Sequence, residues 1–233
     1  MALATFYVPD LLDHQDRVCL SEQEVAHALR ARRLKNGDEL RLFDGQGNVA
    51  LGCLTVESKR RALVDLTSME AASRPETELW IASALPKGDR QRIMIDMLTQ
   101  LGVTGFIPLV CDRSAVKFQD KMLLKWRRYS IEACKQSHNP YVIECREPQS
   151  VTELLENRDN CFYLDQNAQQ IDYINEKAMT LMIGPEGGFS DEELSLLTEK
   201  SAGSLTLGQH ILRTETAAVI AAGTIKANTL SDN

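Results

Sequence analysis

The most informative part of the chain is Met179-Thr-Leu-Met-Ile-Gly184-Pro-Glu-Gly-Gly188-Phe-Ser190-Asp-Glu-Glu193. An apolar strand is expected to end at Ile183, and Ser190 with Glu193 forms a capping box that starts a helix. Between them, residues 184–188 contain three glycines and a proline, which makes a rigid turn with few side chains. At the carboxyl end of a parallel strand, such a turn lets a ligand lie against the backbone. A tight strand-to-helix turn that needs positive φ explains the same residues equally well.

A second strand-end loop follows at Leu205-Thr-Leu-Gly-Gln-His-Ile-Leu-Arg213-Thr-Glu-Thr-Ala217. A helix begins at Thr214 or Thr216, either of which can cap it. Arg213 lies just before this helix, where α/β proteins place their sites, although a surface ion pair with Glu215 would be an ordinary role for it. The two loops form one pocket if their strands are neighbours in the sheet.

Working outward, strand patterns alternate with helix patterns from residue 79 onward, which predicts a mostly parallel sheet covered by helices on both faces. The helix expected over 89–101 is capped by Asp89 and buries an apolar face that includes Ile93 and Met97. Neither G-x-G-x-x-G nor G-x-x-x-x-G-K-S/T occurs, so no cradle for nucleotide phosphates is expected and a Rossmann dehydrogenase is disfavoured.

The first seventy residues favour a small β-barrel with one helix. Ser21-Glu-Gln-Glu24 fits a capping box for a helix that ends near Ala31, and Asp44-Gly45 lies between two strand patterns as a hairpin signal. The polar segment 68–78 lacks periodicity and is the best linker candidate. The predicted domains are therefore a β-barrel over 1–70 and an α/β domain over 76–233.

Composition describes an ordinary globular chain. Its 233 residues hold one large domain or two small ones, with 43% hydrophobic and 25% charged residues. The six cysteines contain no C-x-x-C pair, which excludes zinc-ribbon and thioredoxin motifs, and most are expected to be buried and reduced. No run approaches 18 apolar residues and no leader pattern opens the chain, so a cytoplasmic protein without membrane or metal partners is predicted.

Charge is distributed unevenly. The net charge is −7, from 26 Lys+Arg and 33 Asp+Glu. Residues 147–199 contain twelve acidic and two basic side chains, whereas 27–41 contain five basic and two acidic, and 113–128 contain six basic and one acidic. Solvated helix faces explain such runs, and so does a phosphate-binding surface shared by both domains. The acidic total therefore does not exclude an RNA partner.

Together, the two loops resemble a known enzyme family. Ile183-Gly-Pro-Glu-Gly-Gly-Phe-Ser-x-x-Glu193 followed by Leu207-Gly-x-x-Ile-Leu-Arg-Thr-Glu-Thr-Ala217 is similar to the RsmE family of SPOUT-class methyltransferases, which methylate N3 of a uridine in 16S ribosomal RNA. Leu85-Pro-Lys-Gly-Asp-Arg90 and Arg113-Ser114 resemble its middle motifs. The resemblance implies a PUA-like β-barrel, a SPOUT α/β domain with a C-terminal trefoil knot, and a homodimer. It also implies S-adenosyl-L-methionine as cofactor and 16S rRNA of the small ribosomal subunit as partner.

The resemblance also assigns residues to roles. The residues expected to bind the cofactor are Leu164, Ile183, Gly184, Pro185, Glu186, Gly187, Gly188, Leu207, Gly208, Ile211, Leu212, Arg213 and Thr216. The basic residues expected to contact RNA are Arg30, Arg32, Arg33, Lys35, Lys87, Arg90, Arg113 and Lys117, with Lys121, Lys125, Arg127 and Arg128 as an extension. In catalysis, Arg213 is expected to stabilise either the uracil anion that forms as the N3 proton leaves or the RNA backbone next to it. Glu186 or Glu215 is a candidate proton acceptor, with a structural hydrogen bond as the competing role of each.

Two alternatives stay open. The sequence departs from the family pattern at Met97, Gln100, His138 and Asn139, all outside the cofactor loops. The same scaffold could act on another RNA group, such as a ribose 2′-hydroxyl. It could also be an RNA-binding module in ribosome assembly that does not catalyse.

Overall fold

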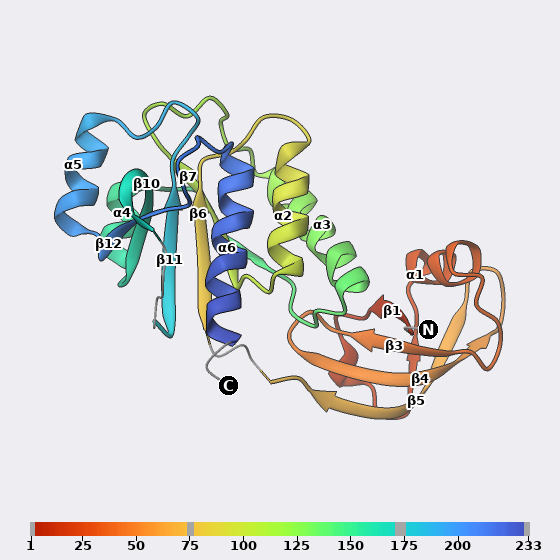
Figure 1. Cartoon of the computed structure of the whole chain (residues 1–233). Helices are drawn as coiled ribbons and strands as arrows, with labels where there is room; N and C mark the ends of the chain where they lie inside the picture. The colour runs from red at the N-terminus through yellow and green to blue at the C-terminus, as the bar shows by residue number, and fades with distance from the viewer. Residues whose placement is uncertain (1–2, 74–76, 171–175, 231–233) are drawn as a thin grey trace. The chain divides into compact units, whose positions relative to one another are not determined.

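A computed structural model describes residues 3–73, 77–170 and 176–230, which belong to two compact units (Figure 1). The first unit comprises Met1–Arg74 and Ile131–Val142, and the second comprises Pro75–Ser130 and Ile143–Asn233. The segment Ile131–Val142 belongs to the first unit although it comes after most of the first half of the chain. A prediction that cuts the chain at one position cannot include such a segment. The expected boundaries at 1–70 and 76–233 stay a prediction.

The first unit is built on a five-stranded sheet in the order β1-β3-β4-β5-β2. Its strands are β1 (Ala4–Tyr7), β2 (Arg17–Cys19), β3 (Glu39–Phe43), β4 (Asn48–Val56) and β5 (Ala62–Ala71). Its helical segments are η1 (Leu11–Asp13), α1 (Glu22–Ala26) and the π-helical turn η2 (His27–Ala31). The predicted hairpin is confirmed by the antiparallel pairing of β3 with β4, and the Glu24 amide donates to the Ser21 side chain at the start of α1.

The linker predicted over 68–78 is wrong at its start. Strand β5 continues to Ala71 because its last four residues pair with β4, where Asn48 lies opposite Ala71. These four residues are exposed, so the polarity that suggested a linker belongs to the solvent-facing end of a strand.

Polar contacts hold the segment Ile131–Val142 within the first unit. The Lys135 ammonium lies 3.0 Å from both carboxylate oxygens of Glu24, and both side chains are almost fully buried. Burial raises the pKa of the Glu24 carboxyl, while the Lys135 charge acts in the opposite direction. The Tyr141 hydroxyl donates to the Ala72 carbonyl at 2.7 Å. Because both charges are buried, removing either side chain should strongly destabilise the first unit.

The second unit contains a seven-stranded sheet, and every strand pairing among its described residues is parallel. The order is β12-β10-β11-β6-β7-β8, with β9 also paired to β7. The strands are β6 (Glu78–Ser83), β7 (Gly105–Val110), β8 (Glu144–Cys145), β9 (Gln149–Ser150), β10 (Cys161–Gln170), β11 (Ala178–Ile183) and β12 (Gly203–Thr206). The prediction of a mostly parallel sheet is confirmed.

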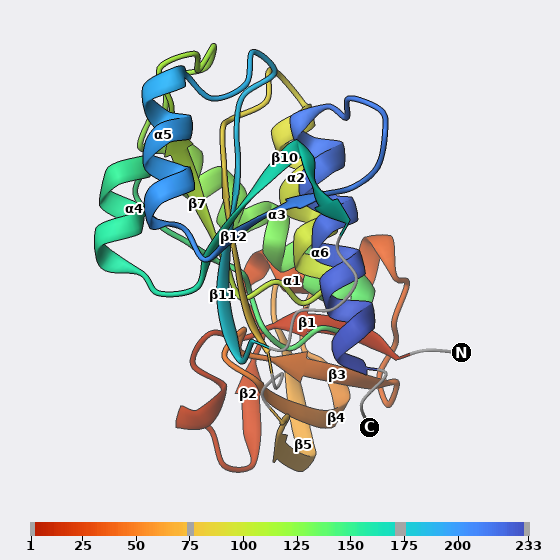
Figure 2. The same cartoon turned by 60° about the vertical axis from the view of Figure 1, so that its left-hand side comes forward.

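Helices cover both faces of this sheet, as Figure 2 shows nearly edge-on. The helices are α2 (Arg90–Gln100), α3 (Lys121–Ser137), α4 (Val151–Asn157), α5 (Asp191–Lys200) and α6 (Thr214–Leu230). One core layer places Leu79 and Ile81 of β6 against α2, α6 and Trp126 of α3. The other places Trp80 and Ala82 of the same strand against α4 and α5. Alternate residues of one strand therefore serve two cores, as a strand buried on both faces requires.

The apolar face predicted for α2 is confirmed at Met94 and Leu98, which are fully buried, and is wrong at Ile93 and Met97. Ile93 and Met97 are 47% and 43% exposed, whereas Ile95 is fully buried beside Met94 and Leu98. The helical spacing fits both apolar stripes, and the tertiary neighbours select one of them. The side chain of Asp89 makes no capping hydrogen bond.

Candidate active site

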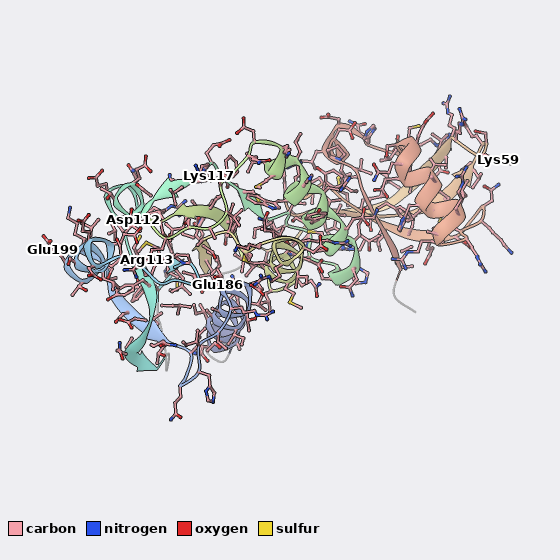
Figure 3. All side chains as sticks on the ribbon, turned by 90° about the horizontal axis from the view of Figure 1, so that it is seen from above. Lys59, Asp112, Arg113, Lys117, Glu186 and Glu199 are labelled. Carbon is pink, nitrogen blue, oxygen red and sulfur yellow. The ribbon has the colours of Figure 1, made fainter. Side chains whose placement is uncertain are left out.

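A cavity of about 410 Å³ lies at the carboxyl ends of β11 and β12, beside the middle of β10 and the start of α6. These ends lie along the upper edge of the sheet in Figure 1, and Figure 3 looks down on that edge. The two glycine loops were expected to meet if β11 and β12 were neighbours. Instead β10 lies between them and adds residues from a bulge within the strand to the cavity. Carboxyl ends of parallel strands are where α/β proteins place ligands.

The loop after β11 needs its glycines for two different reasons. A Cβ on Gly184 would lie 3.0 Å from the Phe189 ring, so close packing restricts that position. Gly188 has a φ of +72°, and its amide donates to the Pro185 carbonyl at 2.8 Å. The tight-turn explanation and the ligand explanation of this motif are therefore compatible, because the turn brings backbone to the cavity wall.

Strand β10 contributes a bulge that the sequence analysis missed. Leu164 and Gln169 both pair with Leu205 of β12, so residues 165–168 leave the ladder. Asp165, Gln166 and Asn167 from this bulge line the cavity. The predicted strand ended at Leu164, and the polar run directly after it was the only sign of a strand-end loop.

The lining of the cavity combines apolar side chains with acidic ones. Among its described residues, the charged side chains are Asp165 and Glu186, with no lysine or arginine. The apolar part includes Leu164, Ile183 and Leu205. Such a lining disfavours anionic phosphates and suits a partly apolar ligand with positive charge. S-adenosyl-L-methionine has no phosphate and carries a sulfonium and an ammonium group, so these residues fit it.

A second cavity, of about 370 Å³, is lined by Arg90, Glu186, Ile211, Leu212 and Arg213. Glu186, Ile211 and Leu212 line both cavities, so the two spaces share a wall. The Arg90 guanidinium donates to Glu186 at 2.9 Å. Arg213 is exposed, and its guanidinium has no polar partner among the described residues. Its charge is therefore available to a ligand.

Glu215 pairs with Arg90 and not with Arg213. One Glu215 carboxylate oxygen lies 3.7 Å from the Arg90 guanidinium, and the other is buried with no hydrogen-bond partner among the described residues. The residue is 8% exposed and lines neither cavity. The surface ion pair considered between Arg213 and Glu215 is not formed.

The structure brings most of the expected cofactor residues together. Those that line the first cavity are Leu164, Ile183, Gly184, Pro185, Glu186, Gly187, Gly188, Leu207, Gly208, Ile211 and Leu212. Arg213 lines the second cavity, and Thr216 lines neither. The lining residues outside the expected set are Asp165, Gln166, Asn167, Phe189, Leu194, Leu205, Thr206, His210, Thr214 and Ala217. Their roles, like those of the expected set, stay predictions.

The residues expected to contact RNA fall into two kinds. Side chains exposed to solvent are those of Arg30, Arg32, Arg33 and Lys35 in the first unit and Lys87 and Lys117 in the second. Arg90 and Arg113 instead contact the loop after β11: Arg90 donates to Glu186, and Arg113 donates to the carbonyls of Gly187 and Phe189. Lys121, Lys125, Arg127 and Arg128 are exposed along α3.

Neither a metal site nor a membrane span emerges from the described part of the chain. Within residues 3–73, 77–170 and 176–230, no group of three His, Cys, Asp or Glu side chains could hold a metal ion. No helix within the same ranges is long and apolar enough to cross a membrane.

Comparison with known families defines the class of the protein. A family model for an RNA methyltransferase domain matches residues 73–226, and a model for an RNA methyltransferase PUA domain matches residues 20–67. A PUA-type sheet together with an α/β unit that holds a cavity at its strand ends is the architecture of an RNA methyltransferase.

Individual relatives narrow this class to one family. The chain is 30% identical to the ribosomal RNA small subunit methyltransferase E of Bacillus subtilis, with 90% of each chain covered. It is 29% identical to that of Aquifex aeolicus, over 86% of this chain and 90% of the relative. A crystal structure of the ribosomal RNA small subunit methyltransferase E of Neisseria gonorrhoeae bound to S-adenosyl methionine matches with a TM-score of 0.88 and 27% identity, covering 97% of this chain and 98% of that one. The chain belongs to the ribosomal RNA small subunit methyltransferase E family, the RsmE family that its two loops resemble.

Proposed function

We propose that this protein uses S-adenosyl-L-methionine to methylate N3 of a uridine in 16S rRNA of the small ribosomal subunit. The observation that carries the proposal is the pair of adjoining cavities, one acidic and apolar and the other lined by Arg90 and Arg213. The family membership supports the same reaction. The first cavity suits the cofactor, and the second suits a base that becomes negatively charged during the reaction.

The first cavity would hold the cofactor through the bulge within β10 and the loops after β11 and β12. When bound, S-adenosyl-L-methionine supplies an electrophilic methyl group on its sulfonium sulfur. The apolar residues Leu164, Ile183 and Leu212 would pack against the ligand and exclude water, while the backbone of residues 184–188 offers hydrogen-bonding groups. Asp165 and Glu186 favour its positive charges.

The second cavity would hold the uracil. Methylation at N3 requires the N3 proton to leave and the resulting negative charge to be stabilised. Arg213 is cationic at any working pH and has no polar partner among the described residues, so we assign to it the stabilisation of that charge. The base must also leave its stack to reach this space, and the exposed Ile211 side chain at the shared wall offers an apolar surface for it.

Of the two candidate proton acceptors, Glu186 is the better placed. It lines both cavities and is exposed, and its Oε1 atom accepts a hydrogen bond from Arg90, while Oε2 has no polar partner among the described residues. Glu215 lines neither cavity and is buried behind Arg90. We therefore assign Glu215 to holding Arg90 in place and Glu186 to accepting the proton.

RNA binding would use the exposed basic residues of each unit. In the first unit these are Arg30, Arg32, Arg33 and Lys35, and in the second they include Lys87 and Lys117. Contacts of this kind release counterions, so affinity for RNA should fall steeply with salt. The cytoplasmic location, the homodimer and the trefoil knot are part of the same proposal and rest on the family resemblance.

The experiment that tests the proposal is single-turnover methylation of 30S subunits that lack this modification, followed by mass spectrometry of the digested RNA. We expect methyl groups on N3 of a uracil base. Methylated ribose would instead support the 2′-hydroxyl alternative, and the absence of both product and cofactor binding would support a non-catalytic RNA-binding module.

The variant Arg213→Ala tests the assignment within the site. It should bind S-adenosyl-L-methionine with nearly wild-type affinity, because Arg213 lies outside the first cavity. Its rate should fall by roughly a hundredfold or more, as when a preorganised donor to a developing anion is removed. Lys59→Ala, at an exposed position in the first unit, is a control that should leave both quantities unchanged. A wild-type rate for Arg213→Ala would remove this residue from the mechanism.

A further inference from the structure

We propose that Arg113 positions the loop after β11, residues 184–190, which we call the cofactor loop. Its charge and sequence position had instead suggested a contact with RNA. The inference rests on the proposed cofactor site and adds a residue that lies outside its lining. Arg113 follows β7, whereas the loop it contacts follows β11, and β6 lies between these two strands. The side chain therefore links two strand ends that are not neighbours. Figure 3 shows Arg113 and Asp112 on the edge that also carries Glu186.

The contacts of Arg113 are made to backbone, which is the part of the loop that builds the cavity wall. Its Nη1 atom donates to the carbonyl of Gly187 at 3.2 Å and to that of Phe189 at 3.0 Å. Its Nη2 atom lies 4.0 Å from the Asp191 carboxylate, in the first turn of α5. A Cβ on Gly187 would meet Cβ of Arg113 at 3.6 Å, so the stem of the side chain also packs along the loop. Both sides of Gly188, the residue with positive φ, are thus held by one guanidinium.

The residue before Arg113 makes a second connection to the same loop. The Asp112 amide donates to a Glu193 carboxylate oxygen at 3.0 Å, and the Asp112 carboxylate accepts from the Ser190 hydroxyl at 2.6 Å. Ser190 and Glu193 are the capping box of α5, so the end of β7 is joined to the helix start that closes the cofactor loop. The β7 end is itself stiffened, because the Cys111 amide donates to the Ser114 hydroxyl and the Ser114 amide donates to the Cys111 carbonyl, both at 3.0 Å.

This arrangement distinguishes Arg113 from Lys117 in the same segment. Lys117 is exposed and has no polar contact among the described residues, as expected of a side chain free to meet phosphate. Arg113 is about half-exposed, yet its Nη1 atom is already committed to two carbonyls. Removing it should loosen residues 187–189, raise the dissociation constant of the cofactor, and leave the chemical step intact once cofactor is saturating.

The test measures cofactor binding in the absence of RNA. If Arg113 only contacted RNA, its substitution would not change this affinity. Isothermal titration of S-adenosyl-L-methionine into Arg113→Met should give a dissociation constant roughly tenfold above wild type, the size expected for losing a partly exposed charge-assisted contact. Arg113→Lys keeps the charge but not the planar guanidinium, so its dissociation constant should also stay raised. Lys117→Ala is the matched control and should bind cofactor as wild type does while losing RNA affinity.

Two further readouts keep the outcomes separate. In steady state, the KM for cofactor of Arg113→Met should rise with kcat nearly retained. By hydrogen exchange of the cofactor-free protein, the Gly188 amide should exchange faster than in wild type, because its bond to Pro185 is less well held. If Arg113→Met misfolds, Asp112→Ala, which removes the acceptor of the Ser190 hydroxyl, should shift both readouts in the same direction.

A wild-type dissociation constant and unchanged Gly188 exchange in Arg113→Met would overturn the proposal and return Arg113 to the RNA surface. Recovery of wild-type affinity in Arg113→Lys would overturn it too, because charge alone would then be sufficient. A wild-type protein that binds no S-adenosyl-L-methionine would instead overturn the proposed function itself, so the two failures are distinguishable.

Discussion

The substitution Gly105→Ala tests the packing between β6 and β7 with a single methyl group. Gly105 begins β7 and lies opposite Trp80 of β6 in the parallel register. A Cβ at Gly105 would overlap the six-membered ring of Trp80, where the farthest of three ring atoms would be only 2.5 Å away. The ring is 3% exposed, the guanidiniums of Arg146 and Arg158 both lie 4.1 Å from its centroid, and its Nε1–H donates to Glu78 at 2.7 Å. The indole therefore has little freedom to move aside.

The structure allows the cost to be worked out in steps. Inserting a methyl group into a well-packed core costs about 1–3 kcal/mol, and three overlapping ring atoms place this site near the upper end, at about 3 kcal/mol. For a domain of this size, 1 kcal/mol corresponds to roughly 2–4 °C in Tm. We expect Gly105→Ala to lower the Tm of the α/β unit by about 6–12 °C in a calorimetric scan. The proposed cofactor cavity is at the opposite ends of the strands, so the dissociation constant of S-adenosyl-L-methionine at 20 °C should change less than twofold.

Two comparisons make the reasoning refutable. Gly223→Ala is the matched control, because its Cβ would meet only Leu101 at an ordinary 3.9 Å and a helix interior favours alanine, so it should stabilise by up to about 1 kcal/mol. In the background Trp80→Leu, which removes the ring, adding Gly105→Ala should cost little further. A Tm for Gly105→Ala within 2 °C of wild type, or an equal cost in both backgrounds, would contradict the strand register described above.

Three further outcomes are expected. Gly188→Ala should weaken S-adenosyl-L-methionine binding in a titration, because a φ of +72° at this loop position strains any residue with a Cβ; unchanged binding would mean the loop adapts. Burial raises the pKa of the Cys111 and Cys145 thiols to about 12, above that of an unfolded thiol, so the stability they contribute is fully present below about pH 8.5 and is lost as pH rises toward 12. The urea midpoint should therefore fall between pH 8 and pH 10.5, and less steeply in Cys145→Ala; equal slopes would count against this linkage. Lys135→Met should destabilise the first unit by about 3 kcal/mol in urea unfolding, because it leaves the Glu24 carboxylate buried without its cationic partner. Lys135→Met with Glu24→Gln should recover part of the loss, and a double variant no more stable than the single one would argue against the pair.

Local rules account for the parts of the fold and site that sequence analysis predicted. The capping box of Ser190 and Glu193 forms as predicted, because its hydrogen bonds join residues three apart. The glycine loop at 184–188 was recognised for the same reason, because consecutive residues form its turn. The parallel sheet followed from the alternation of strand and helix patterns, which has few other packed solutions.

Long-range packing accounts for what sequence analysis missed. The exposed face of α2 at Ile93 and Met97 depends on which apolar stripe the neighbouring elements cover. The bulge at residues 165–168 depends on β12 pairing with β10 at two positions of the same strand. Arg90 binds Glu186 and Glu215 across 96 and 125 positions of sequence, which no spacing rule anticipates.

The amino-acid sequence alone was sufficient for the two glycine loops, because their turns are formed by contiguous residues. The same loops carried the resemblance to the RsmE family, and that resemblance implied the cofactor. The sequence also showed that the acidic total conceals basic segments. Only the tertiary structure placed β10 between β11 and β12, so that a bulge in β10 and the ends of β11 and β12 enclose one cavity. It also showed that Arg113 contacts the loop after β11 and that Glu215 pairs with Arg90, since strand order determines which distant side chains meet. Charge and sequence position had suggested other partners for Arg113 and Glu215. They could not identify the actual partners, because the partner of a charged side chain depends on which groups the fold places next to it.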